Sequence, residues 1–158
     1  MLIDMASRMM RKSMSKIHYE FTQAPPVEMD GVYGIYLNVP LCYTRCSYCP
    51  FYSEPFTQHA GILDVYLEAV RMEIQQSQLR GKPQWMYVGG GTPNTLTIPQ
   101  LEVLVNEVRK QVDPGRLGIE LLPARVDEAY LRGLHSLGFG RISMGVQTFD
   151  EEIIRKTG

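Results

Sequence analysis

Segments typical of strands and of helices alternate along this chain from residue 33 to residue 158, and this alternation limits the possible folds more than any other feature. We expect strands at residues 33–39, 85–88, 117–121 and 141–145. This alternation predicts an α/β fold with a parallel sheet, in which each helix packs on the sheet and connects one strand to the next. Ligands of such folds lie at the C-terminal ends of the strands.

Each expected helix has its own sequence signal. Residues 62–79 carry apolar side chains at helical spacing on one face. These side chains are Leu63, Tyr66, Leu67, Val70 and Ile74. Thr97 to Gln100 form a capping box with an early proline, which predicts a helix from there to about Val112. Asp127 and Asp150 are each expected to cap a further helix.

The three cysteines of the chain, Cys42, Cys46 and Cys49, lie close together in a C-x3-C-x2-C spacing. Thiolates at short spacing are typical ligands of an iron–sulfur cluster or of zinc. On a [4Fe–4S] cluster, three cysteine ligands leave one iron open. An open iron can bind a substrate or a cofactor, so the spacing favours a reactive centre.

Two other interpretations of the cysteines stay open. A zinc site would take a histidine as its fourth ligand, and His18, His59 and His135 are available, although none lies at the short spacing of a zinc knuckle. Buried, unreactive thiols are the other alternative. A disulfide framework is disfavoured, because the number of cysteines is odd and no secretory signal precedes them.

A glycine run, Gly89-Gly90-Gly91-Thr92-Pro93, directly follows the second expected strand. Glycines at this place let the backbone approach a ligand, because no Cβ atom stands in the way. The run is not a P-loop, since the pattern G-x4-G-K followed by Ser or Thr is absent. By itself it predicts a tight loop between a strand and a helix. Its position after the cysteine motif makes it more specific.

Taken together, these motifs resemble the N-terminal part of the radical S-adenosylmethionine (SAM) superfamily. Within it, they resemble the oxygen-independent coproporphyrinogen III oxidase family and its haem-chaperone relatives. The matching stretches are residues 35–53, residues 89–93, a partial match at residues 120–123, and residues 141–150. The resemblance implies the (βα)4 portion of a radical SAM (β/α)6 partial TIM-like barrel. Residues 32–158 are expected to form a truncated core domain of this kind.

The resemblance also implies a role for particular residues. Cys42, Cys46 and Cys49 would bind a [4Fe–4S] cluster whose open iron takes SAM. The expected SAM-binding residues are Tyr36, Tyr48, Gly89, Gly90, Gly91, Thr92, Glu120 and Gln147. The residues of the glycine run would hold the methionine end of SAM, and Glu120 would accept hydrogen bonds from the ribose hydroxyls.

The implied activity is the reductive cleavage of SAM to a 5′-deoxyadenosyl radical, acting on a tetrapyrrole or another organic substrate. This would make the chain a coproporphyrinogen dehydrogenase-like oxidoreductase of porphyrin biosynthesis, with an electron donor such as flavodoxin or ferredoxin. One alternative is a haem-binding chaperone that keeps the cluster and the SAM pocket without turnover. Another is an inactive fragment that needs a partner.

Three positions depart from the family pattern. Asn38 stands where the family often has histidine, and Leu122 replaces the usual asparagine that follows the SAM-binding glutamate. Pro50 follows the last cysteine, and the classical oxidases carry an extra cysteine beyond that point. Lacking that cysteine, the loop is closer to the chaperone-like branch.

Composition adds modest constraints. A net charge of -1 gives no indication of a nucleic-acid partner, and no apolar run reaches the length of a transmembrane segment. Free thiols fit a reducing cytoplasm. Residues 1–31 are expected to form a flexible, basic, methionine-rich tail and linker.

Overall fold

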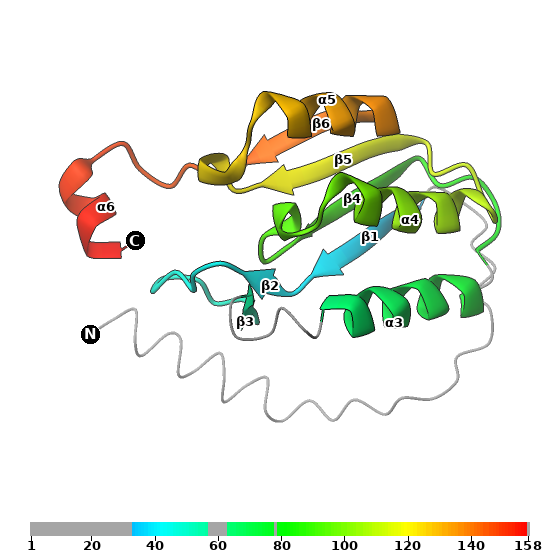
Figure 1. Cartoon of the computed structure of the whole chain (residues 1–158), viewed down its shortest axis with the longest axis horizontal. Helices are drawn as coiled ribbons and strands as arrows, with labels where there is room; N and C mark the ends of the chain where they lie inside the picture. The colour runs from blue at the N-terminus through cyan, green and yellow to red at the C-terminus, as the bar shows by residue number, and fades with distance from the viewer. Residues whose placement is uncertain (1–32, 57–62, 78, 158) are drawn as a thin grey trace.

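A parallel sheet of four strands, in the order β1-β4-β5-β6, forms the centre of the molecule (Figure 1). The computed structural model describes residues 33–56, 63–77 and 79–157. The strands are β1 (Gly34–Val39), β4 (Trp85–Gly90), β5 (Arg116–Leu121) and β6 (Phe139–Met144). The parallel sheet predicted from the sequence is thus confirmed. The tail expected over residues 1–31 lies outside the described residues.

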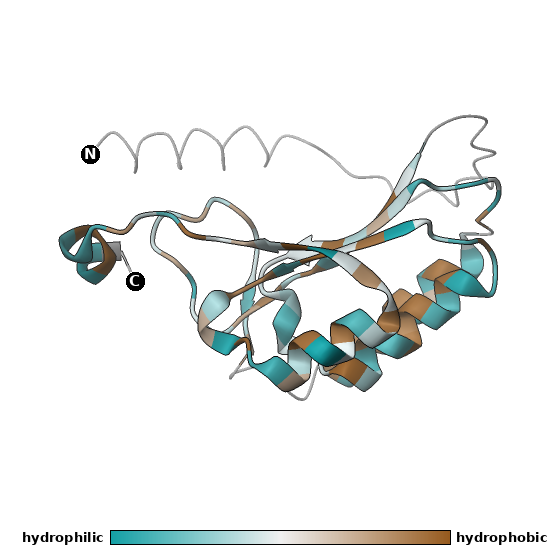
Figure 2. Ribbon diagram, turned by 90° about the horizontal axis from the view of Figure 1, so that it is seen from above, coloured by the Kyte–Doolittle hydropathy of each residue, from teal (hydrophilic) through white to brown (hydrophobic). Residues whose placement is uncertain are grey.

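The helices are α3 (Leu63–Gln76), α4 (Ile98–Arg109), α5 (Glu128–Leu137) and α6 (Glu151–Thr157). Helices α3, α4 and α5 all lie on one side of the sheet, as the view from above shows (Figure 2). The order of strands and helices confirms the (βα)4 arrangement. Two helices end before the predicted residue, α3 at Gln76 and α4 at Arg109. Residues 110 and 111 form a turn directly after α4.

The predicted helix caps are present. The Thr97 hydroxyl accepts the Gln100 N–H at 3.4 Å, and the Gln100 side chain accepts the Thr97 N–H at 2.8 Å. Asp127 accepts the Tyr130 N–H at 2.7 Å, and Asp150 accepts the Glu152 N–H at 2.8 Å. Each cap satisfies an N–H group that the helix itself leaves unpaired.

The hydrophobic core lies between the sheet and the three helices. Alternate strand residues point into it, for example Val39, Met86, Val88 and Ile119, which are fully buried. Each such side chain contributes about 1.5–3 kcal/mol relative to an exposed one. The opposite side of the sheet, which we call the inner face, carries the other alternate residues.

The sequence predicted a loop over the whole glycine run, but only part of the run lies outside the sheet. Gly89 and Gly90 belong to β4, where they pair with Asn38 and Val39 of β1. Strand β4 is therefore longer than residues 85–88. Glycine lacks a side chain but keeps both backbone hydrogen-bonding groups, so it can continue a ladder.

Two short strands and two single-turn helices were not predicted. They are β2 (Leu41–Cys42), β3 (Glu54–Pro55), η2 (Pro93–Thr95) and η3 (Pro123–Arg125). All of them lie near the C-terminal ends of the main strands, where the expected ligand-binding motifs are found.

Glu107 joins α4 to α3 and should make the stability depend on pH. Its carboxylate accepts hydrogen bonds from Lys110 and Gln75, both at 2.8 Å. These two bonds lower the pKa of Glu107 below 4.5, although burial opposes the shift. Because the folded-state pKa is below the unfolded one, the contribution is present above about pH 4.5 and is lost as the pH falls through the folded-state pKa.

We therefore expect Glu107→Gln to be less stable than wild type at neutral pH, with a smaller difference at an acidic pH well below 4.5. Urea denaturation of both at each pH measures the difference. A difference that stays the same at both pH values would contradict this account of Glu107.

Candidate functional site

All three cysteines lie on a loop that is closed at its base. Leu41 and Cys42 of β2 pair with Glu54 and Pro55 of β3, and the Glu54 N–H donates to the Pro40 carbonyl at 2.8 Å. Residues 43–53, between the two short strands, carry the other two cysteines. The closed base brings the three thiols to the end of β1.

Within this loop the cysteines are free and partly buried. The Cys49 N–H donates to the Cys46 carbonyl at 3.2 Å, which makes a turn between the second and third cysteines. Partly buried thiols on a turn can reach a cluster and stay sheltered from bulk water. The three predicted metal ligands thus lie on one short loop at the end of β1.

The end of the glycine run lies directly against the first cysteine. The Gly91 N–H donates to the Val39 carbonyl and the Thr92 N–H donates to the Leu41 carbonyl, both at 2.7 Å. A Cβ atom on Gly91 would stand 2.6 Å from the Leu41 carbonyl oxygen and 2.8 Å from Cys42 Sγ. No side chain fits there without displacing the cysteine loop.

The other two glycines are also closely covered by β1. Gly90 has a φ of +111°, which side-chain-bearing residues rarely adopt, and a Cβ there would overlap the Asn38 side chain. A Cβ on Gly89 would overlap the hydroxyl of Tyr36. A side chain at any of the three glycines would thus collide with β1 or with the cysteine loop, so the backbone of the glycine run lies directly against these segments.

Glu120 lies near the glycine run, at the C-terminal end of β5. It is half-buried and stands opposite Ser143 of β6. The pKa of Tyr36 is raised, first by burial and then by the charges of Glu120 and Tyr87, so Glu120 lies close enough to act on this tyrosine. Among the interactions of the described residues, no hydrogen bond or ion pair involves the Glu120 carboxylate. Tyr36, Gly89 and Glu120 thus lie near one another on the inner face of the sheet.

Tyr36 also belongs to a row of residues that crosses the whole inner face. Strand register places Tyr36 beside Tyr87, Tyr87 beside Gly118, and Gly118 beside Arg141. The rings of Tyr36 and Tyr87 stack, with centroids 6.1 Å apart and planes 17° apart. Tyr87 was missed from the sequence, although alternation along β4 puts it on the same face as Gly89.

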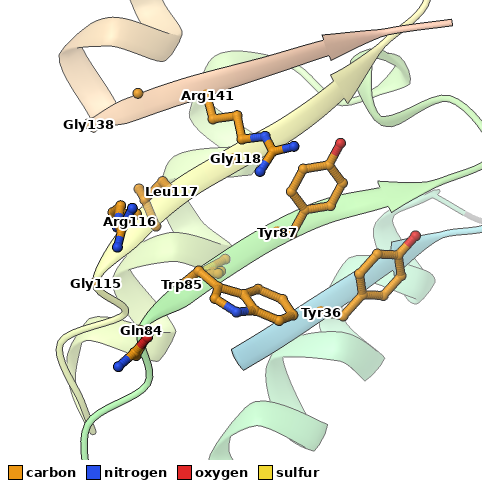
Figure 3. Close-up of a pocket in the computed structure, with 12 residues that line it drawn as sticks. Tyr36, Gln84, Trp85, Tyr87, Gly115, Arg116, Leu117, Gly118, Gly138 and Arg141 are labelled. Carbon is orange, nitrogen blue, oxygen red and sulfur yellow. The ribbon is translucent and has the colours of Figure 1, made fainter. Parts of the chain in front are cut away.

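A hollow of about 930 Å³ opens on the inner face beside this row (Figure 3). Its lining includes Gln84, Gly115 and Gly138, which precede β4, β5 and β6, so the hollow lies toward the N-terminal ends of the strands. The cysteines lie at the opposite ends. The hollow therefore lies away from the cysteines, although Tyr36 lines it as well as contacting Gly89.

The two remaining predicted SAM-binding side chains, Tyr48 and Gln147, lie in different surroundings. The neighbouring Cys46 side chain, then burial and the charges of Cys46 and Cys49, raise the pKa of Tyr48. Gln147 is exposed in the segment between β6 and α6. In the described part of the chain, no hydrogen bond joins Gln147 to the other predicted site residues.

The donor set fits a [4Fe–4S] cluster and SAM. Soft thiolates are the preferred ligands of iron–sulfur clusters, and Gly91 of the glycine run lies against Cys42. The Glu120 carboxylate, at the end of β5, can accept hydrogen bonds from a ligand such as SAM. Over residues 33–56, 63–77 and 79–157, no three His, Cys, Asp or Glu side chains converge to hold one metal ion. A cluster does not require such convergence, because each thiolate binds its own iron.

Comparison with known families agrees with this geometry. The profile of the radical SAM superfamily matches residues 39–158. This chain belongs to the radical SAM superfamily. Over the described residues, none of its helices is long and apolar enough to cross a membrane.

Two similar proteins come from Synechocystis sp. An oxygen-independent coproporphyrinogen III oxidase is 35% identical over 131 residues, which cover 76% of this chain and 27% of the relative. A heme chaperone HemW is 34% identical over 131 residues, which cover 78% of this chain and 32% of the relative. The chain thus spans about a third of the length of the curated relatives it matches.

A solved structure shows the same fold. Coproporphyrinogen III oxidase (HemN) from Escherichia coli, a radical SAM enzyme, matches with a TM-score of 0.70 at 29% identity. The match covers 78% of this chain and 30% of that protein. The resemblance drawn from the motifs and the partial TIM-like barrel are both confirmed.

Proposed function

We propose that this chain is the cluster- and SAM-binding part of a radical SAM oxidoreductase that acts on a tetrapyrrole, as a coproporphyrinogen dehydrogenase does. The observation that carries the proposal is the contact between the glycine run and the cysteine loop. Because Gly91 leaves no room for a Cβ beside Cys42, the glycine run and a proposed cluster ligand lie in direct contact. The proposed tetrapyrrole substrate rests on the similarity to coproporphyrinogen III oxidases.

Each residue of the site has a role in this proposal. Cys42, Cys46 and Cys49 bind the cluster as thiolates. The backbone of the glycine run lies along the methionine end of SAM, and Glu120 accepts hydrogen bonds from the ribose hydroxyls. Tyr36 covers the same site from β1, the Tyr48 backbone contacts the adenine, and Gln147 reaches it from beyond β6.

When bound, the cluster and SAM would supply the radical chemistry, which would begin with the cleavage of SAM by one electron. A flavodoxin or a ferredoxin is the proposed source of that electron. The chain's own part is to hold the two cofactors together and to shelter them from water and oxygen. Its free thiols agree with a reducing cytoplasm.

A haem-binding chaperone is the second candidate function. HemW proteins match this chain about as well as the oxidases do, with 34% against 35% identity for the two from Synechocystis sp.. The cysteine loop also lacks the extra cysteine of the classical oxidases. In this case the cluster and SAM would bind, and haem would bind without conversion of a substrate.

Anaerobic reconstitution tests the proposed function. We expect about four iron and four sulfide ions per chain, and a reduced-cluster electron paramagnetic resonance spectrum that changes when SAM is added. Zinc in place of iron, or no metal, would contradict the proposal for this chain. Haem titration then separates the two candidates, because the chaperone binds haem without consuming SAM.

A further inference from the structure

A buried side-chain amide connects the glycine run to the end of β5. Asn94, in η2, is only 6% exposed. Its Nδ2 group donates to the carbonyl oxygens of Leu122 (3.1 Å) and Arg125 (3.2 Å), and its Oδ1 accepts the Leu122 N–H (2.9 Å). Both Nδ2 protons are therefore used. Burial of an amide is unfavourable without such bonds, so the contacts hold this side chain in one position.

These contacts begin where the strand ladder stops. The paired residues of β4 and β5 end at Val88 and Ile119, and the next residues of the two strands are Gly89 and Glu120. Asn94 follows the glycine run and bonds to the backbone just after Glu120. The spacing between the glycine run and Glu120 therefore depends on Asn94 as well as on the sheet.

The same residue reaches the cysteine loop through Tyr43, which follows Cys42. The Tyr43 hydroxyl donates to the Asn94 carbonyl in a long bond of 3.4 Å. The Tyr43 ring packs edge-on against Phe56, with centroids 5.2 Å apart, and the Arg125 guanidinium lies 4.3 Å from its centroid. Tyr43, Asn94 and Arg125 thus form a closed set of contacts that joins three loops.

We propose that Asn94 is a positioning residue that sets the spacing between the two ends of the SAM site. The inference rests on the proposed function, in which the glycine run holds the methionine end and Glu120 holds the ribose. Asn94 acts through the backbone on both sides and touches neither end of SAM itself. A small change in spacing misplaces one set of contacts, which weakens SAM binding even where the cluster assembles normally.

Two variants and one control test this role. Asn94→Ala removes all three side-chain bonds. Asn94→Asp keeps the shape of the side chain and its Oδ1 acceptor, but it replaces the Nδ2 donor with an oxygen that faces the two carbonyl oxygens. This variant is used if Asn94→Ala yields too little folded protein. Asn106→Ala is the matched control, because Asn106 is exposed on α4 away from the site. Equilibrium SAM binding and iron content are measured on the reconstituted chain.

We expect the SAM dissociation constant to rise about tenfold or more in both Asn94 variants, which corresponds to about 1.4 kcal/mol. Iron should stay at about four per chain, and Asn106→Ala should behave like wild type. In the metal-free chain, the Leu122 amide should exchange its hydrogen faster in Asn94→Ala, whereas the Ile119 amide should keep its rate.

SAM affinity within about twofold of wild type in Asn94→Asp would overturn the inference. Loss of iron together with SAM would also overturn it, because Asn94 would then support the cluster rather than the spacing of the SAM site. Failure of the proposed function looks different: in that case the unaltered chain itself does not respond to SAM.

Discussion

Replacing Gly91 with alanine is expected to abolish assembly of the iron–sulfur cluster. The added Cβ would stand 2.6 Å from the Leu41 carbonyl oxygen and 2.8 Å from Cys42 Sγ. The carbonyl belongs to the backbone and is held by the Thr92 N–H at 2.7 Å, so it cannot turn away freely. Overpacking of this kind costs about 1–3 kcal/mol, and here the strain falls on a cluster ligand.

Metal analysis of the Gly91→Ala protein after anaerobic reconstitution should show iron falling from about four per chain to less than about one. Gly140→Ala is the matched control. A Cβ on Gly140 meets no atom within 4 Å, and its φ lies outside the left-handed region. Normal iron content and an unchanged SAM response in Gly91→Ala would show that the cysteine loop can move away, against the tight contact described above.

Replacing Cys46 with alanine should have an effect of similar size for a different reason. A cluster held by three thiolates loses a ligand, and alanine offers no atom that can bind iron. Iron should again fall to less than about one per chain, and the reduced-cluster spectrum should disappear. The metal-free chain should unfold at nearly the wild-type temperature, because Cys46 is only partly buried.

Thr44→Ala is the control for Cys46→Ala, since Thr44 is an exposed residue of the same loop. Elemental analysis for both iron and zinc is essential to the comparison. A Cys46→Ala chain that still holds about four irons would exclude Cys46 as a ligand. About one zinc per wild-type chain, lost in the variant, would support the zinc interpretation instead.

The sequence predicted local structure well where the cause is local. The capping box of Thr97 and the cap at Asp127 form as expected, because the side chain and the N–H group it satisfies are close in sequence. The apolar face of α3 also packs on the core as predicted. The predicted C-terminal end of β4 was wrong, because the pairing of Gly89 and Gly90 depends on β1, a distant segment.

The candidate site was predicted only in part. The motifs named Gly91 and Cys42, but nothing in them indicated that the two residues touch. Asn94 was missed, although it directly follows the glycine run, because its bonding partners lie near residue 122. The sequence alone drew attention to the loss of an asparagine at Leu122, whereas the structure places a buried asparagine side chain against the Leu122 backbone.

The sequence by itself determined the kinds of elements, their order and the family, because periodicity, caps and motif spacing are local properties of the chain. Tertiary structure decided which motif residues meet. Gly91 lies on Cys42, and Glu120 lies near Tyr36, only because parallel strands far apart in sequence end at the same edge of one sheet. That register is set by packing of the whole core against three helices, which no short stretch of sequence encodes.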